Sequence, residues 1–318
     1  MSDPIPPEAD PLDEALASLR REIQTRFGAR REIERAPAVD WAALYTQLRR
    51  WASSFGMSER SGEVDEFGLD ATALASAAPL LEFLYERWWR VDLQGLEHLP
   101  AQGPALLVAN HSGLLPYDGL MLAHGVERWH ASGERPRFLV ADWLVTLPFV
   151  QPALARLGGV RACRENAERL LRAGRFVIAF PEGVKGAAKV FRERYRLKRF
   201  GRGGVVRLAL ACRVPLVPVG IVGAEETHPI LFKAHTAARA VGLPFLPVTP
   251  TFPWLGPAGL APLPSKWVIR VGRPLPLDHL EPDAAEDELL IARLTEDLRS
   301  QIQGLVDVAL ADRESIWG

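Results

Sequence analysis

The sequence is poor in cysteine, in net charge and in long apolar segments. Its 318 residues include only two cysteines, Cys163 and Cys212, and 39 acidic residues nearly balance 38 basic ones. Two cysteines cannot form a disulfide framework and lack metal-ligand spacing, so we expect no metal site and a reducing cytoplasm. The balanced charge argues against a dedicated nucleic-acid-binding protein. The acidic, proline-rich start lacks the basic residues and apolar run of a signal peptide, so we expect no export by that route.

One stretch is long enough to span a bilayer, because residues 240–265 contain no Asp, Glu, Lys or Arg. The same stretch contains seven prolines, which would remove helical hydrogen bonds along its whole length. We therefore expect no membrane span there. The apolar side chains Phe252, Trp254 and Leu255 suit either a loop that covers the core or a surface that dips into lipid.

Short apolar runs alternate with helical patterns from residue 93 onward. Each run is too short for a helix and apolar enough for a strand buried on both faces, and the runs lie at 105–109, 138–141, 176–180, 215–222 and 268–271. Helices are expected between them, at 118–125, 146–157, 165–173 and 204–212. Strand followed by helix, repeated, predicts an α/β fold with a mostly parallel sheet flanked by helices.

Helical segments are also predicted at both ends of the chain. Residues 1–90 form an acidic tail and a helical extension, with helices at 12–27, 41–51 and 71–91, and residues 91–318 form the α/β domain. The domain ends in a helix with one apolar stripe, which should pack on the sheet. The stripe consists of Ile291, Leu294, Leu298, Ile302, Leu305 and Ala309.

A histidine and an aspartate follow the first predicted strand. His111 lies just beyond residue 109, at the strand end where open α/β sheets place active sites, and Asp118 follows it along the chain. A helix between them would separate them by roughly 10.5 Å, but Pro116 favours a helix start, so His111 should lie in a loop folded back over Asp118. The pattern predicts a general base with its orienting carboxylate. The alternative is a structural histidine in a capped turn.

A second apolar strand ends in Pro181, Glu182 and Gly183. Parallel strands end at the same edge of a sheet, so Glu182 should lie near His111. There it could hold an acceptor hydroxyl or a cationic side chain. The alternative is a cap of a helix or turn.

A basic block follows directly. Residues 185–207 contain nine basic residues and a single acid, Glu193. The block includes Lys185, Lys198 and Arg202, and the glycines around Arg202 could offer backbone N–H groups to an anion. Phosphates of a cofactor, a phospholipid head group or an anionic membrane surface would fit this block, and the alternative is a solvated charged face.

Several familiar motifs are missing from the sequence: the G-x-S-x-G nucleophile elbow, the G-x-x-x-x-G-K-[ST] phosphate loop, the G-x-G-x-x-G fingerprint and H-E-x-x-H. Their absence removes the main support for a serine hydrolase, a nucleotide hydrolase or a zinc protease. A histidine base without a protein nucleophile remains, which suits direct transfer to a substrate hydroxyl.

Four sequence blocks, in order, resemble the glycerolipid acyltransferase superfamily, which contains bacterial lysophosphatidate and glycerol-3-phosphate acyltransferases. The first block matches at Asn110, His111 and Asp118, although six residues separate the last two here where the family has four. The second matches at Gly158 and Arg164, with Arg161 in place of an aromatic residue. The third, F-P-E-G, matches fully at 180–183, and the fourth, an apolar strand with two prolines, matches at 214–219.

The resemblance implies an O-acyltransferase domain at residues 91–318 that moves a fatty acyl group from acyl-CoA or acyl-carrier protein to a glycerolipid-type hydroxyl. It implies His111 and Asp118 as catalytic residues and Glu182 and Gly183 as acceptor-positioning residues. It also implies that phosphate is bound by Arg164 and, in the basic block, by Lys185, Lys198 and Arg202. No cofactor beyond the acyl donor is expected.

The favoured acceptor is a lysophospholipid or glycerol phosphate, on an anionic membrane surface at the inner face of the cytoplasmic membrane. The longer first block and residues 252–267 look more like the branch near monoacylglycerol and diacylglycerol acyltransferases. The alternatives are therefore a neutral-lipid acyltransferase, with a mono- or diacylglycerol or long-chain alcohol acceptor, and a catalytically silent lipid-binding module.

Overall fold

The structure is a computed structural model, which describes residues 64–317 except 114, 146–149, 235–237 and 239–244. All of these residues belong to one compact unit, Leu48–Gly318. The helices predicted at 12–27 and 41–51 lie outside the described residues. The division of the chain at residues 90 and 91 stays a prediction.

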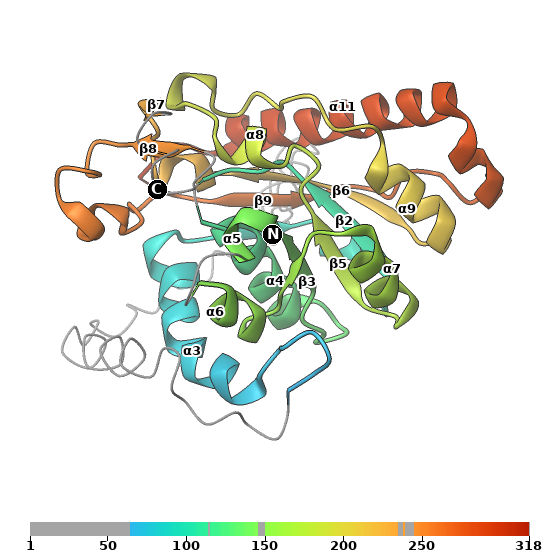
Figure 1. Ribbon diagram of the computed structural model, residues 1–318, viewed down its shortest axis with the longest axis horizontal. Coiled ribbons are helices and arrows are strands. Elements are labelled where there is room, and N and C mark those ends of the chain that lie inside the picture. The colour runs from blue at the N-terminus through green and yellow to red at the C-terminus, as the bar shows by residue number, and fades with distance from the viewer. Residues whose placement is uncertain (1–63, 114, 146–149, 235–237, 239–244, 318) are drawn as a thin grey trace, which may run out of the picture. The chain divides into compact units, whose positions relative to one another are not determined.

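A seven-stranded sheet lies at the centre of this unit (Figure 1). Its strands are β1 Asp92–Gln94, β2 Ala105–Ala109, β3 Arg137–Val140, β4 Gly159–Arg161, β5 Phe176–Ala179, β6 Leu216–Val222 and β9 Val268–Val271. The spatial order is β1-β9-β6-β2-β5-β3-β4. The strands from β6 to β4 in this order run parallel, whereas β9 is antiparallel to β6 and carries β1 parallel to itself. The predicted fold class, a mostly parallel sheet flanked by helices, is confirmed.

Helices cover both faces of the sheet. They are α3 Ala71–Phe83, α4 Tyr117–Trp129, α5 Asp142–Val145, α6 Val150–Arg156, α7 Arg164–Arg172, α8 Val184–Ala187, α9 Gly204–Cys212 and α11 Glu288–Asp312. A π-helical turn, Leu84–Trp88, continues α3. Short 3₁₀ turns are η2 Leu96–His98, η3 Phe191–Glu193, η4 Ala224–Glu226, η5 Gly256–Leu260 and η6 Pro282–Glu286. A separate antiparallel pair, β7 Phe232–Ala234 and β8 Leu246–Val248, lies between β6 and β9 in the chain.

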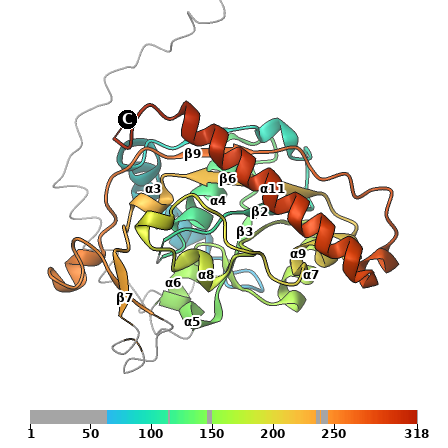
Figure 2. The same cartoon turned by 90° about the horizontal axis from the view of Figure 1, so that it is seen from above.

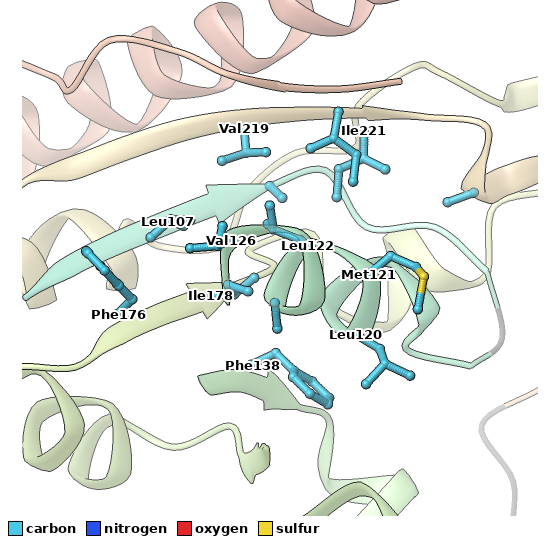
Figure 3. Close-up of a cluster of buried hydrophobic side chains, with 14 of the residues drawn as sticks. Leu107, Leu120, Met121, Leu122, Val126, Phe138, Phe176, Ile178, Val219 and Ile221 are labelled. Atoms are coloured by element: carbon cyan, nitrogen blue, oxygen red, sulfur yellow. The ribbon is translucent and has the colours of Figure 1, made fainter. Parts of the chain in front are cut away.

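Alternating side chains of the central strands point to opposite faces of the sheet and belong to two hydrophobic cores. Leu107 and Ile178 point to the face covered by α3 and α4, where they lie among Leu122 and Val126 of α4 (Figure 3). Leu106 belongs to the opposite core, with residues of α7, α9 and α11. Because every residue of β2 is buried, this strand provides a rigid support for the loop that follows it.

Helix α11 lies across one face of the sheet (Figure 2). Asp287 caps its start, since the carboxylate accepts the N–H groups of Leu289 and Leu290, both at 3.0 Å. The predicted apolar stripe is confirmed, with Leu298 and Ile302 fully buried in the core beneath the helix.

Most of the predicted elements are present. The predicted strands correspond to β2, β3, β5, β6 and β9, and the predicted helix at 204–212 matches α9. The helix predicted at 71–91 is present as α3 and the π-helical turn but ends at Trp88, and Ala77 and Leu81 of α3 join the same core as the sheet. The three-residue strands β1, β4, β7 and β8 were not predicted. Among the described residues, no helix is long and apolar enough to cross a membrane.

Candidate active site

His111 and Asp118 are in direct contact at the carboxyl end of β2. Helix α4 begins right after Pro116, so the intervening loop folds back and brings His111 Nδ1 to 2.7 Å from Asp118 Oδ2. The Asp118 side chain is fully buried, and it also accepts the backbone N–H groups of Ser112 at 3.0 Å and Gly119 at 2.8 Å. Three donors thus hold one carboxylate in a single orientation.

This contact fixes the form of the imidazole. An ionised carboxylate only accepts hydrogen bonds, so Nδ1 of His111 carries the proton and Nε2 is left with its lone pair. The ring of Phe180 lies against the imidazole, with ring centroids 4.6 Å apart. The His111 side chain is 13% exposed and lines a cavity. Nε2 is therefore a base with access to a ligand.

Asn110 anchors the backbone from which His111 projects. Its side-chain amide donates to the carbonyl of Ile221 at 2.9 Å and accepts the Ile221 N–H at 2.7 Å. The side chain is completely buried, so this pair of hydrogen bonds extends the pairing of β2 with β6 beyond the last strand residue.

Glu182 is a buried neighbour of His111. Its Oε1 accepts the backbone N–H of His111 at 2.9 Å, and its Oε2 accepts the backbone N–H of Lys198 at 2.6 Å. The Nζ atom of Lys189 lies 3.4 Å from Oε2, and the Glu182 side chain has no exposed surface. The sequence placed Glu182 beside His111, and the structure brings them together through the backbone. Direct contact between Glu182 and an acceptor stays a prediction.

Two glycines adjoin this carboxylate. Gly183 has φ +55° and immediately precedes α8, so its backbone conformation disfavours any other residue. A Cβ on Gly186 would lie 2.6 Å from the Cβ of Glu182 and 3.0 Å from that of His111. Helix α8 therefore packs against the site so closely that Gly186 has no room for a side chain.

A cavity of about 420 Å³ opens beside His111 at this edge of the sheet. Its walls come from the ends of β3 and β5 and from α7 and α9. The apolar lining includes Leu139, Ala162, Ala167, Val205 and Leu208, and the polar lining includes Arg164, Arg202 and Arg207. Such a lining suits a molecule with an apolar chain and an anionic group.

The predicted phosphate-binding residues separate into two groups. Arg164 and Arg202 line the cavity with Gly183, whereas Lys185 and Lys198 do not. Arg164 is 67% exposed and lies 2.6 Å from Glu168. Lys198 pairs with Glu193 at 2.9 Å.

The basic block is less uniform than its sequence indicates. Lys189 is buried, and Arg207 pairs at 2.8 Å with Glu288, which is remote in the sequence. These pairings reduce the charge that the block presents to solvent.

The sequence did not identify the apolar wall of the cavity, or Arg207 as part of its lining. The helical spacing of Val205 and Leu208 on α9 suits a core face, and nothing local distinguishes a core face from a cavity wall. The glycine-rich segment before α9 was the available signal, since Gly201 and Gly204 also line the cavity.

Comparisons with known proteins agree with these features. A family model described as Acyltransferase matches residues 90–222. An uncharacterized protein of Mycobacterium leprae is 46% identical over 255 residues, covering 80% of this chain and 70% of its own. An uncharacterized protein of Mycobacterium bovis is 40% identical over 319 residues, covering 97% and 88%.

More distant relatives carry functional names. The human "DGAT1/2-independent enzyme synthesizing storage lipids" is 24% identical over 227 residues, covering 69% of this chain and 62% of its own. The crystal structure of the 1-acyl-sn-glycerophosphate (LPA) acyltransferase PlsC from Thermotoga maritima aligns with a TM-score of 0.47 and 20% identity, covering 86% of this chain and 90% of that one. The chain belongs to the same family as its near-full-length mycobacterial relatives, and the family model over residues 90–222 identifies it as an acyltransferase of the glycerolipid acyltransferase superfamily.

Proposed function

We propose that this enzyme moves a fatty acyl group from acyl-CoA or acyl-carrier protein to a hydroxyl of a glycerolipid-type alcohol. The observation that carries the proposal is the His111–Asp118 pair at 2.7 Å, at the edge of a cavity with apolar walls and three guanidinium groups. The proposal needs no cofactor beyond the acyl donor.

The reaction follows from the form of the imidazole. Nε2 of His111 takes the proton of the acceptor hydroxyl while the oxygen attacks the thioester carbonyl carbon. The tetrahedral intermediate collapses, the carbon–sulfur bond breaks, and His111 returns the proton to the departing thiolate. The products are an ester and a free thiol. Asp118 stabilises the imidazolium that forms between the two proton transfers.

A phosphate-bearing acceptor, such as a lysophospholipid or glycerol phosphate, is the favoured substrate. Guanidinium groups are well suited to phosphate because they offer paired donors. Arg164 and Arg207 each have an acidic partner, whereas Arg202 has no ion-pair partner among the described residues. We assign the acceptor phosphate to Arg202 first, with Arg164 as a second ligand.

A neutral acceptor is the second candidate. Similarity to an enzyme named for storage-lipid synthesis favours a mono- or diacylglycerol or a long-chain alcohol. The acidic partners of Arg164 and Arg207 favour it too, because they neutralise part of the positive charge at the cavity.

The chain between β6 and β9 supports action at a membrane surface. Residues 227–265 contain two basic residues and no acidic one. They expose large apolar side chains, with Trp254 at 73%, Leu255 at 61% and Phe232 at 57%. Because β6 is parallel to β2, this segment leaves the sheet at the same edge as His111. We propose shallow insertion into the inner face of the cytoplasmic membrane, with anionic lipid attracting the exposed residues of the basic block.

The direct test measures free-thiol release from long-chain acyl-CoA with a panel of acceptors. Lysophosphatidate and glycerol 3-phosphate represent the favoured class, and monoacylglycerol, diacylglycerol and a long-chain alcohol the second. Thiol release that requires a phosphate-bearing acceptor supports the first assignment. Release only with neutral acceptors moves the assignment to the second, and lipid binding without any release contradicts acyl transfer to these alcohols.

A vesicle assay tests the membrane part. The protein should sediment with anionic vesicles at low salt and less so at high salt, because salt screens exposed charges. Trp254→Ala combined with Leu255→Ala should weaken this binding, whereas Leu289→Ala, at an apolar side chain that is 84% exposed on α11, should not. Equal loss in both variants contradicts a local insertion site.

A further inference from the structure

Lys189 is an ammonium group enclosed between two carboxylates below the candidate active site. Its Nζ atom lies 2.6 Å from Glu225 Oε1 and 3.4 Å from Glu182 Oε2. The exposed fractions of the three side chains are 2% for Lys189, 0% for Glu182 and 6% for Glu225. Among the described residues, Lys189 is the one cation within ion-pair distance of either carboxylate. Burial of this kind is costly, so the cluster requires an explanation.

The two carboxylates hold the segments that build the site. Glu182 accepts the backbone N–H of His111 at 2.9 Å and that of Lys198 at 2.6 Å. Glu225 accepts the backbone N–H of Tyr195 at 2.6 Å. The loop that carries His111 and the segment from Tyr195 to Lys198, which leads to Arg202, are therefore held by the same two buried carboxylates.

Lys189 determines whether these charges persist. Two carboxylates enclosed together without a cation cannot both stay ionised, because desolvation and mutual repulsion favour a proton on one of them. Burial already raises the pKa of Glu225, and Lys189 opposes that rise. Loss of negative charge from this pair would weaken the hydrogen bonds that it accepts from backbone N–H groups, that of His111 included, since hydrogen bonds to ionised acceptors are about twice as strong as neutral ones.

We propose that Lys189 is a positioning residue for acyl transfer: its ammonium group compensates the two enclosed carboxylates, and one of these, Glu182, holds the His111 backbone so that the imidazole stays aligned with the cavity. Lys189 contacts no substrate in this arrangement. Glu182 likewise acts on the protein rather than on the acceptor. The kinetic part of this inference rests on the proposed function.

The test compares Lys189→Met with Arg137→Met. Arg137 is also a buried cation, 3% exposed and paired with Asp65, but it starts β3, whereas the cavity is lined by Leu139 and Ala141 toward the other end of that strand. Each kinetic constant is measured at a temperature where both variants are folded. We expect Lys189→Met to lower kcat by up to about 100-fold, because small displacements of a catalytic group have effects of that size, with KM for acyl-CoA nearly unchanged. Arg137→Met should lower the unfolding temperature and leave kcat unchanged. Equal kcat in the two variants overturns the proposal.

A second measurement does not depend on activity. Amide hydrogen exchange of peptides that contain His111 should be faster in Lys189→Met than in wild type and unchanged in Arg137→Met. Faster exchange together with no acyl transfer by the wild type would support the positioning contact and refute the proposed function. Unchanged exchange with an active wild type would refute the positioning contact alone.

A double variant separates Glu182 from Glu225. Lys189→Met with Glu225→Gln removes one buried negative charge, so it should recover stability and keeps the test usable if the single variant fails to fold. With Glu225 uncharged, Glu182 no longer has a second enclosed carboxylate beside it, so kcat and His111 protection should recover at least in part relative to Lys189→Met. A double variant with kcat as low and His111 exchange as fast as in Lys189→Met would mean that the loss does not come from the uncompensated pair of carboxylates, which contradicts the proposal.

Discussion

Replacing Asp118 by asparagine removes one negative charge and preserves the shape of the side chain. The amide nitrogen must face either Gly119 N–H, at the Oδ1 position, or both His111 and Ser112, at the Oδ2 position. In the first placement one N–H group, that of Gly119, loses its acceptor, and in the second two groups lose theirs. The amide nitrogen should therefore face Gly119, and the amide oxygen should stay in contact with His111. The imidazole then keeps its proton on Nδ1, and the variant lacks only the charge that stabilises the imidazolium.

The size of this loss follows from Coulomb's law. Two unit charges about 4 Å apart at an effective dielectric constant near 20 interact by about 4 kcal/mol. At about 1.4 kcal/mol per factor of ten, kcat should fall about 10³-fold. KM should change little, because Asp118 is fully buried and does not line the cavity. One buried N–H left without an acceptor should lower the free energy of unfolding by about 1–3 kcal/mol.

The assay is free-thiol release from acyl-CoA at saturating acceptor. The matched control is Asp70→Asn, because Asp70 is also a buried carboxylate at a helix start, where it accepts the N–H groups of Thr72 and Ala73. The control should lose stability and keep its kcat. A folded Asp118→Asn enzyme with kcat within tenfold of wild type would refute the role given to this charge.

Three further changes have expected outcomes. Gly186→Ala should lower kcat and destabilise the protein by about 1–3 kcal/mol, because the added Cβ meets Glu182 and His111; kcat equal to wild type would contradict this close packing. Arg202→Ala should raise KM for phosphate-bearing acceptors about tenfold and leave neutral acceptors unaffected, and an equal rise for both would show that Arg202 binds no phosphate. Burial lowers the pKa of His228 in the folded protein below its ordinary value of 6.5. As the pH falls, the unfolded chain therefore binds a proton at this residue before the folded protein does, so the free energy of unfolding should decrease at pH values below about 6.5. His228→Gln should reduce the loss of melting temperature between pH 7 and pH 5, and an unchanged loss would exclude His228 as its source.

Local chemistry in the sequence was enough to predict the contact at the centre of the site. Pro116 marks the start of α4, which favoured a loop that brings His111 back over Asp118, and the structure shows this contact. The unbroken apolar runs of β2 and β5 identified buried strands, because only a sheet covered on both faces buries every residue of a strand. The three-residue strands carry no such signal, and their pairing depends on partners elsewhere in the chain.

The burial and the ion pairs of Lys189 could not be predicted from the sequence. Lys189 and Lys185 belong to the same basic block, yet Lys185 is exposed and Lys189 is enclosed by Glu182 and Glu225. Lys189 differs from Lys185 because Glu225, in the turn η4 directly after β6, lies within ion-pair distance of Lys189. The sequence likewise placed Glu182 at the right edge of the sheet without indicating that its oxygen atoms are already bound by backbone N–H groups and a lysine.

The central claim is that Nε2 of His111 removes the proton of the acceptor hydroxyl. The most direct measurement is the rate of thiol release and ester formation by His111→Ala, compared with wild type across the acceptor panel, alongside its thermal unfolding. The rate should fall by at least about 10²-fold with the fold intact, because a general base contributes about 10²–10⁴ to such reactions. A folded variant that keeps more than about a tenth of the wild-type rate would contradict the claim.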